Sequence, residues 1–228
     1  PTRYSNLISF ATAFEARFLR VQGSVLASFI HDKLHPKTRL MDGMKARDNI
    51  TKFTPALFID FPLVDKYANG TTTKFSVRTF AKRSFRMPTF NENYFYHFGS
   101  PSLKPESTWQ YTVGLTWQHQ LTRMWQALFT LDGYMNRVTN QIVAVPYNMF
   151  VWTNINLGKV NSSGLELTTQ QTLSLTPRQQ FIFYASYSFQ HTVDRTDVTT
   201  DSYNKQIAYI PKHTTAASLI WRNPWVNL

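Results

Sequence analysis

The sequence predicts an all-β fold: an antiparallel transmembrane β-barrel, to which this chain contributes a fragment of about nine strands. Three observations support this prediction. Apolar and polar residues alternate with a period of two along most of the 228 residues. The alternating runs are longer than most strands of soluble proteins. The connections between them also differ systematically in length along the chain.

The clearest element is an expected hairpin at residues 108–136. Strands of soluble sheets usually have about five or six residues, whereas a tilted strand that crosses a bilayer needs roughly 9–11. Both arms have the longer length, and aromatic rings lie near both ends of the apolar row, as in the interfacial girdles of barrels. For this hairpin alone, a buried strand of a soluble sandwich is the alternative. The apolar rows are Trp109, Tyr111, Val113, Leu115 and Trp117, and then Trp125, Ala127, Phe129, Leu131 and Met135.

The same alternation predicts strands along the rest of the chain. The other expected strands are at 4–14, 18–30, 51–61, 74–82, 163–173, 181–190 and 209–221. Pro55 removes a ladder donor, so a bulge or a weakly paired neighbour is expected there.

The expected connections are unequal. Short ones are predicted at 15–17, 119–124 and 174–180, a moderate one at 63–73, and long ones at 31–48, 84–106, 145–161 and 192–208. Outer-membrane barrels have short periplasmic turns and longer extracellular loops. An open sheet in lipid would leave unpaired backbone groups at several kcal/mol each, so the strands are expected to belong to a larger closed barrel. Because the sequence starts at Pro1 without a signal peptide, we expect a processed or truncated piece.

Composition narrows the function classes. The absence of cysteine excludes disulfides, thiolate metal sites and cysteine nucleophiles. The net charge of +11 could indicate a nucleic-acid partner. However, the densest basic group, at 78–86, has neither a basic helix nor an RNA-binding aromatic signature, so solvated loops and a polar lumen are expected instead.

No catalytic motif is present. The sequence contains no HExxH, no GxSxG and no phosphate-binding glycine loop. His31 and His35 are four residues apart, but the charged loop containing Pro36 offers no helix to align them as metal ligands. We therefore expect a protein that is not an enzyme and that has no catalytic residue, cofactor or metal site.

Three segments together resemble the C-terminal portion of the β-barrel of TonB-dependent outer-membrane receptors. They are Phe85–Phe95 (FRMPTFNENYF), Ser102–Trp117 (SLKPESTWQYTVGLTW) and Asn156–Leu173 (NLGKVNSSGLELTTQQTL). The resemblance implies a 22-stranded barrel, filled by an N-terminal plug, that imports scarce nutrients across the outer membrane of a Gram-negative bacterium with energy from TonB. Residues 1–228 would be one part of that single barrel domain. The plug and the closing C-terminal strand are expected to be absent from it, so TonB contact would occur through the missing plug.

Five residues of these segments are expected to organise a loop over the lumen. Pro88 fixes the backbone just after Arg86. Asn91 and Glu92 can accept hydrogen bonds from loop amides and from Arg86. Glu106 lies on the polar side of its strand and is expected to anchor the same loop. A structural role is expected for all five rather than contact with substrate.

Loop aromatics are the candidate substrate contacts. They are Tyr94, Tyr96, Tyr147, Phe150 and Trp152. Iron chelates, cobalamin, haem, glycans and peptides are all compatible cargoes, and outer-membrane lipid and a surface lipoprotein are further expected partners. The alternatives are a carbohydrate-binding all-β protein, in which these rings and Phe95 would form a sugar platform, and a structural or adhesin barrel.

Overall fold

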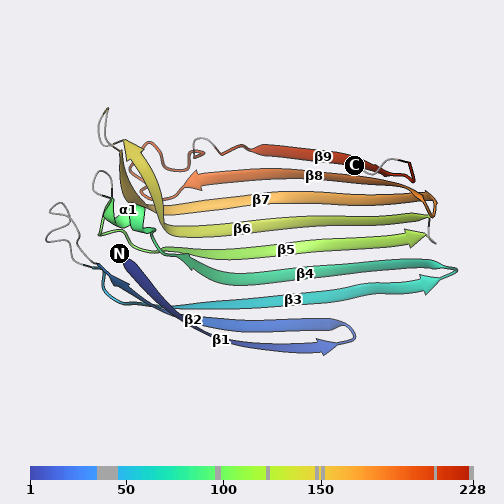
Figure 1. The fold of residues 1–228 in the computed structure, drawn as a ribbon, viewed down its shortest axis with the longest axis horizontal. Coiled ribbons are helices and arrows are strands. Elements are labelled where there is room, and N and C mark those ends of the chain that lie inside the picture. Colours follow the sequence, from blue (N-terminus) through green and yellow to red (C-terminus); the bar gives the residue numbers. More distant parts are fainter. Residues whose placement is uncertain are drawn as a thin grey trace.

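A computed structural model describes residues 1–34, 46–95, 99–121, 124–146, 149, 152–207 and 210–225. These residues form one curved antiparallel sheet of nine strands in sequence order, β1 to β9 (Figure 1). The strands are β1 (Thr2–Ala16), β2 (Leu19–Lys33), β3 (Ile50–Ala68), β4 (Thr71–Arg86), β5 (Glu106–Leu121), β6 (Trp125–Pro146), β7 (Trp152–Thr176), β8 (Gln179–Asp194) and β9 (His213–Arg222). Pairing is described only between consecutive strands, so β1 and β9 are the edges of an open sheet.

The expected central hairpin is confirmed as β5 and β6. Trp109 opposes Arg137, Val113 opposes Gly133, and Trp117 opposes Phe129 in an uninterrupted register. Opposing residues on paired strands point to the same face of a sheet. The apolar rows predicted from the alternation therefore share one face.

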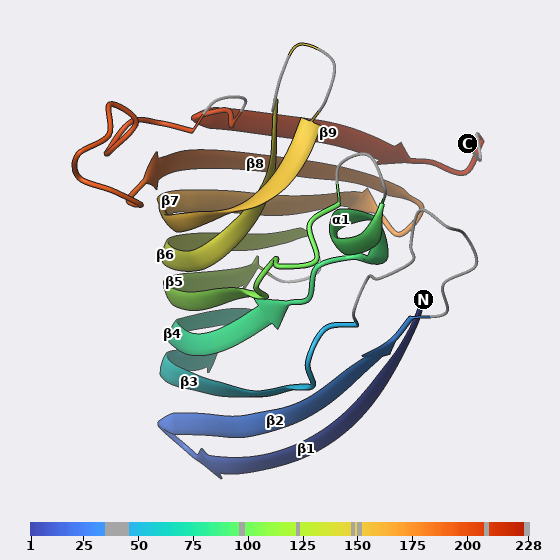
Figure 2. The same cartoon turned by 90° about the vertical axis from the view of Figure 1, so that its left-hand side faces the viewer.

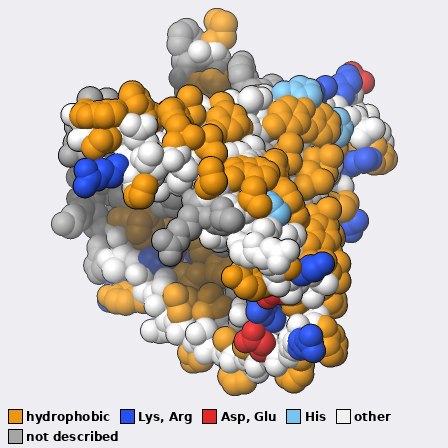
Figure 3. All heavy atoms as spheres, turned by 90° about the vertical axis from the view of Figure 1, so that its right-hand side faces the viewer, with side chains coloured by type: hydrophobic (Ala, Val, Ile, Leu, Met, Phe, Trp, Pro, Cys, Tyr) orange, Lys and Arg blue, Asp and Glu red, His pale blue; other side chains and the backbone are white. Residues whose placement is uncertain are grey.

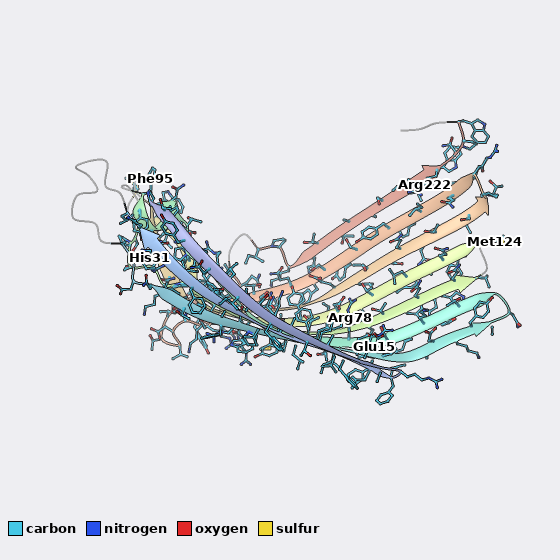
Figure 4. All side chains as sticks on the ribbon, turned by 60° about the horizontal axis from the view of Figure 1, so that its bottom comes forward. Glu15, His31, Arg78, Phe95, Met124 and Arg222 are labelled. Carbon is cyan, nitrogen blue, oxygen red and sulfur yellow. The ribbon has the colours of Figure 1, made fainter. Side chains whose placement is uncertain are left out.

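The two ends of the sheet differ as predicted. One end has tight turns, and the other has the longer connections and the short helix α1 (Phe90–Tyr94) (Figure 1). His31 and Phe95 lie at the loop end, and Met124 lies at the turn end (Figure 4).

Two expected connections are wrong in length. The link at 63–73 is a two-residue turn, because Asn69 and Gly70 both have positive φ (52° and 76°), as a type I′ hairpin turn requires. The long loop at 145–161 is also wrong, because β6 continues to Pro146 and β7 starts at Trp152. Pro55 pairs with Val25 of β2 without a bulge, but the ladder between β3 and β4 begins only at Ala56, so the expected weak pairing beside Pro55 is confirmed. The register of β3 shifts between Pro62 and Val64.

The sheet is a trough with two different faces. Helix α1 lies on the concave side, near the mouth at the loop end (Figure 2). Its Glu92 contacts Arg86, which pairs with Glu106, so the even-numbered residues of β5 face the concave, inner side. The odd-numbered residues face outward and include exposed apolar side chains such as Val113. Hydrophobic groups cover much of the outer surface seen from the turn end (Figure 3).

Most of the buried side chains cluster near the loop end. Leu103, Tyr94, Val160 and Val193 are each at most 4% exposed. A single-layer sheet buries little by itself, so this small core forms where the connections pack against the strands. In the described part of the chain no helix is long and apolar enough to cross a membrane.

Candidate functional site at the mouth and inner wall

The β4–β5 connection enters the trough through a short capped helix. Thr89 is the N-cap of α1, and its Oγ1 accepts from the Glu92 N–H at 3.2 Å. In return, the Thr89 N–H donates to Glu92 Oε2 at 2.7 Å. This reciprocal capping box satisfies two backbone donors that would otherwise lack partners. The sequence TFNE therefore fixes where α1 begins, although we did not predict a helix there.

Arg86 joins this helix to the sheet. Its Nε and Nη2 donate to the two oxygens of Glu106 at 2.8 and 2.9 Å, a bidentate pair between β4 and β5. Its Nη1 donates to both oxygens of Glu92, at 3.0 and 3.1 Å. One guanidinium therefore links β4, α1 and β5, as only a planar fork with several donors can.

The electrostatics of this cluster favour its charged form. Burial of the Glu92 carboxyl opposes ionisation, but hydrogen bonds from Thr89 and the Arg86 charge outweigh it and hold the pKa of Glu92 below its usual range. The hydrogen bonds to Glu106, despite some burial, raise the pKa of Arg86. Both groups are therefore ionised at neutral pH.

The cluster extends across two further strands. Glu106 Oε1 also accepts from the Ile142 N–H of β6 at 2.6 Å. Asn156 of β7 accepts from the Lys104 N–H at 2.8 Å and donates to the carbonyls of Lys104 and Asn140 at 3.0 and 2.8 Å. Asn140 has a positive φ of 56°, a conformation that asparagine tolerates better than most residues. The β4–β5 connection is thus fastened to β6 and β7.

The first strand fastens the same connection from the other side. Arg3 forms a bidentate pair with Asp32 of β2 at 2.7 and 2.8 Å. Its Nη1 donates to the Pro88 carbonyl at 3.0 Å, and its guanidinium lies 5.0 Å from the centre of the Phe90 ring. The connection therefore bridges the trough from β1–β2 to β6–β7. Sequence reasoning missed Arg3 and Asp32, because neither belongs to a recognisable motif.

The structure places the five expected loop-organising residues unequally. Arg86, Glu92 and Glu106 meet in one cluster, and Pro88 is fully buried beside Arg3. Asn91 is exposed, and among the described residues it contributes only its backbone carbonyl, which accepts from the Phe95 N–H at 3.2 Å. The expected bond between the Asn91 side chain and Arg86 is replaced by the two glutamate pairs.

The five candidate substrate contacts also differ in where the structure places them. Tyr94 is only 4% exposed, and its hydroxyl accepts from the Arg47 N–H at 3.4 Å, so its ring packs inside the loop. Trp152 is 56% exposed at the start of β7. Tyr96, Tyr147 and Phe150 lie outside the described residues, as does His35.

The inner wall carries a row of ion pairs halfway along the sheet. Arg78 of β4 donates to Asp132 of β6 through Nη2 at 2.6 Å and Nε at 3.2 Å, reaching over the intervening strand β5. The residue below is Gly114, where a Cβ would lie 2.1 Å from Asp132 Oδ1 and 2.8 Å from Arg78 Nε. Only glycine leaves room for this pair. On the same row, Nη1 of Arg20 in β2 lies 3.7 Å from Oδ2 of Asp60 in β3.

Aromatic and polar side chains line a hollow beside this row. Phe58, Phe80 and Tyr134 border it together with Gln110 and Glu166. Glu166 is exposed and makes no hydrogen bond or ion pair within the described part of the chain. In those residues there is also no group of three or more His, Asp or Glu side chains that could hold a metal ion. The hollow thus combines aromatic rings with amide and carboxylate groups on the inner wall.

Comparison with known proteins agrees with this geometry. The chain is 30% identical over 105 residues to the vitamin B12 transporter BtuB of Photobacterium profundum, a match covering 44% of this chain and 16% of that protein. Its fold is similar to that of the copper transporter OprC, with a TM-score of 0.65 and 18% identity over 97% of this chain and 32% of the other. The chain thus spans less than a third of the length of either protein. Residues 28–228 match the family described as "TonB dependent receptor-like, beta-barrel", and the chain therefore belongs to the TonB-dependent receptor family, as part of its β-barrel.

Proposed function

We propose that this chain forms part of the wall and mouth of an outer-membrane receptor that binds a scarce nutrient and imports it in an energy-coupled way. The observation that carries the proposal is the β4–β5 connection, which Arg86, Arg3 and Asn156 hold across the mouth of a polar trough. A fixed connection at the mouth can present side chains to a ligand at low cost in conformational entropy. The polar wall below it then offers a path inward.

The trough is proposed to enclose a further part of the same receptor, the plug through which TonB would act. Glu166 supports this, because its carboxylate points to the inner side without an ion-pair partner among the described residues. A cation on a segment that fills the lumen would supply the ion-pair partner of Glu166. The half-buried Phe58 and Phe80 side chains on the inner wall would pack against the same segment.

The cargo belongs to this proposal as well. The names of the two relatives place cobalamin and copper first in any panel, followed by iron chelates, haem, glycans and peptides. Trp152 and Phe95, 56% and 38% exposed at the loop end, are the described aromatics best placed to contact a ligand. Tyr96, Tyr147 and Phe150 remain candidates for the same role, and a surface lipoprotein is a candidate partner at this end.

A transport assay tests the proposal. A strain lacking the complete receptor is grown with each nutrient of the panel as the limiting source, and uptake is restored with the wild-type gene, with or without TonB. We expect the deletion strain to lose uptake of one nutrient. The wild-type gene should restore this uptake only when TonB is present. The alternative, a carbohydrate-binding protein without transport, predicts glycan binding with unchanged uptake in every arm. Recovery of the complete protein from the soluble fraction would contradict the receptor proposal and also the alternative of a structural or adhesin barrel.

A further inference from the structure

The outer face of the sheet carries a basic patch at its loop end, formed by Arg83, Trp109, Arg137 and Lys159. The Arg83 guanidinium lies 5.9 Å from the centre of the Trp109 ring, and its Nε donates to Ser107 Oγ at 3.1 Å. Trp109 and Arg137 are register partners, and Lys159 pairs with Thr139 two residues further along. Register partners share a face. The three cations, on β4, β6 and β7, therefore point away from the trough.

Among the described residues these outward cations have no acidic partner, unlike Arg3, Arg78 and Arg86 of the inner face. All carboxylates of strands β5 to β8 occupy even, inward positions: Glu106, Asp132, Glu166 and Asp194. The only lysine and arginine in the same strands are Arg137 and Lys159, both at odd, outward positions. Within the described residues every ion pair of Arg3, Arg78 and Arg86 lies inside the trough or at its mouth. In β5 to β8 the carboxylates therefore face inward and the cations face outward.

The patch lies where the outward row of apolar side chains ends, on the side of the loop end. Trp109 stacks on Tyr111 with ring centres 6.1 Å apart, and the outward row continues with Val113 and Leu115 towards the turn end. Indole and phenol rings favour the headgroup level of a bilayer. Arg137 and Lys159 are both exposed and lie at this level or just beyond it. A spacing of about 4.8 Å between strands puts the Arg83 and Arg137 backbones roughly 10 Å apart.

We propose that this patch binds the phosphate groups of an anionic lipid in the membrane leaflet on the loop side. Arginine forks match phosphate oxygens in pairs, and lysine adds a point charge. Trp109 would lie beside the sugar or glycerol part of the headgroup, with its apolar face towards the acyl chains. The proposal depends on the membrane placement of the sheet, but it does not depend on the cargo or on TonB.

Lipid binding by the complete receptor tests this inference. The purified receptor in a neutral detergent is titrated with diphosphorylated lipid A and, in parallel, with the same lipid after phosphatase treatment, and binding is followed by native mass spectrometry. The double variant R137A/K159A should bind the phosphorylated lipid about 25-fold more weakly, or five-fold per charge, from ~1 kcal/mol per basic residue at an anionic surface. Wild type and double variant should bind the phosphatase-treated lipid equally weakly.

Two controls make the outcome decisive. R178A removes an exposed cation from the β7–β8 turn at the opposite end of the sheet and should leave the affinity unchanged. Raising the salt concentration should weaken wild-type binding far more than that of the double variant. Equal affinity of wild type and R137A/K159A for the phosphorylated lipid would overturn the proposal. So would an equal loss in R178A, or tight binding of the dephosphorylated lipid. If the double variant does not fold, R137Q alone and the salt dependence of the wild type decide the same question.

Discussion

Replacing Gly114 with alanine should break an ion pair between two strands that are not neighbours. A Cβ at residue 114 would lie 2.1 Å from Asp132 Oδ1 and 3.1 Å from Arg78 Cγ, so both side chains must move. Each charge-assisted hydrogen bond in the pair is worth about 1.5–3 kcal/mol when shielded. The side chains are 33% and 19% exposed, however, so screening reduces the whole pair to roughly 1–2 kcal/mol.

The net effect combines this loss with a gain in the strand. Alanine removes the conformational cost of glycine in a strand, about 0.5 kcal/mol at the low end of its range. Gly114→Ala should therefore lower the free energy of unfolding by ~0.5–1.5 kcal/mol. In an Asp132→Ala background the pair is already absent, and the same change should be neutral or slightly stabilising.

A double-mutant cycle on the complete receptor measures this coupling. The four proteins are unfolded with urea in lipid vesicles and followed by tryptophan fluorescence. The expected coupling energy is ~1–2 kcal/mol. Gly133→Ala is the matched control, because a Cβ there would meet Leu165 Cδ2 at an ordinary 3.4 Å. If Gly114→Ala costs the same with and without Asp132, the glycine does not serve the ion pair and the reasoning is refuted.

Three further predictions concern the mouth. Arg86→Ala should reduce surface assembly of the complete receptor, and Arg86→Lys should restore it only partly because lysine cannot pair bidentately with Glu106; normal assembly with lost uptake would contradict the structural role. Because the pKa of Glu92 is lowered, its stabilising contribution is present above its ordinary value of 4.5 and is lost as pH falls through the folded value. Protease nicking of 87–105 should thus increase at acidic pH in wild type, and Glu92→Gln should be nicked equally at both ends of the range. Asn156→Ala removes three hydrogen bonds and should speed hydrogen exchange at Lys104, whereas unchanged exchange would show that the connection is held elsewhere.

The sequence was sufficient to predict the sheet but not where its strands end. Alternation is strict from Trp109 to Trp117, as in barrel strands whose outer face meets lipid, because each side chain of such a strand is restricted to one solvent. Beyond the apolar belt both faces meet water or polar loops, and the pattern fades. Strand β6 therefore continues to Pro146 and β7 begins at Trp152, in a stretch whose composition resembles a loop.

The candidate site was predictable only where its residues belong to one motif. Arg86, Glu92 and Glu106 lie within 21 residues of one another and were identified together. The contacts of Arg3 with Pro88 span 85 residues and depend on how far the sheet curves. The role of Gly114 depends on the register of three strands. Such long-range contacts follow from tertiary geometry, which no local pattern records.

The distribution of charge explains why the net charge of +11 is a poor guide to partners. Inside the trough, Arg78 and Arg86 are neutralised by carboxylates of other elements. On the outer face a carboxylate beside Trp109 would meet anionic headgroups without a counter-charge, whereas Arg137 and Lys159 would meet them favourably. The face of the sheet on which a charge lies therefore decides what it can bind. Adding one acid to the outer face, as in Asn161→Asp beside Arg137, should lower the charge of the patch by one and weaken lipid binding without altering any inner ion pair.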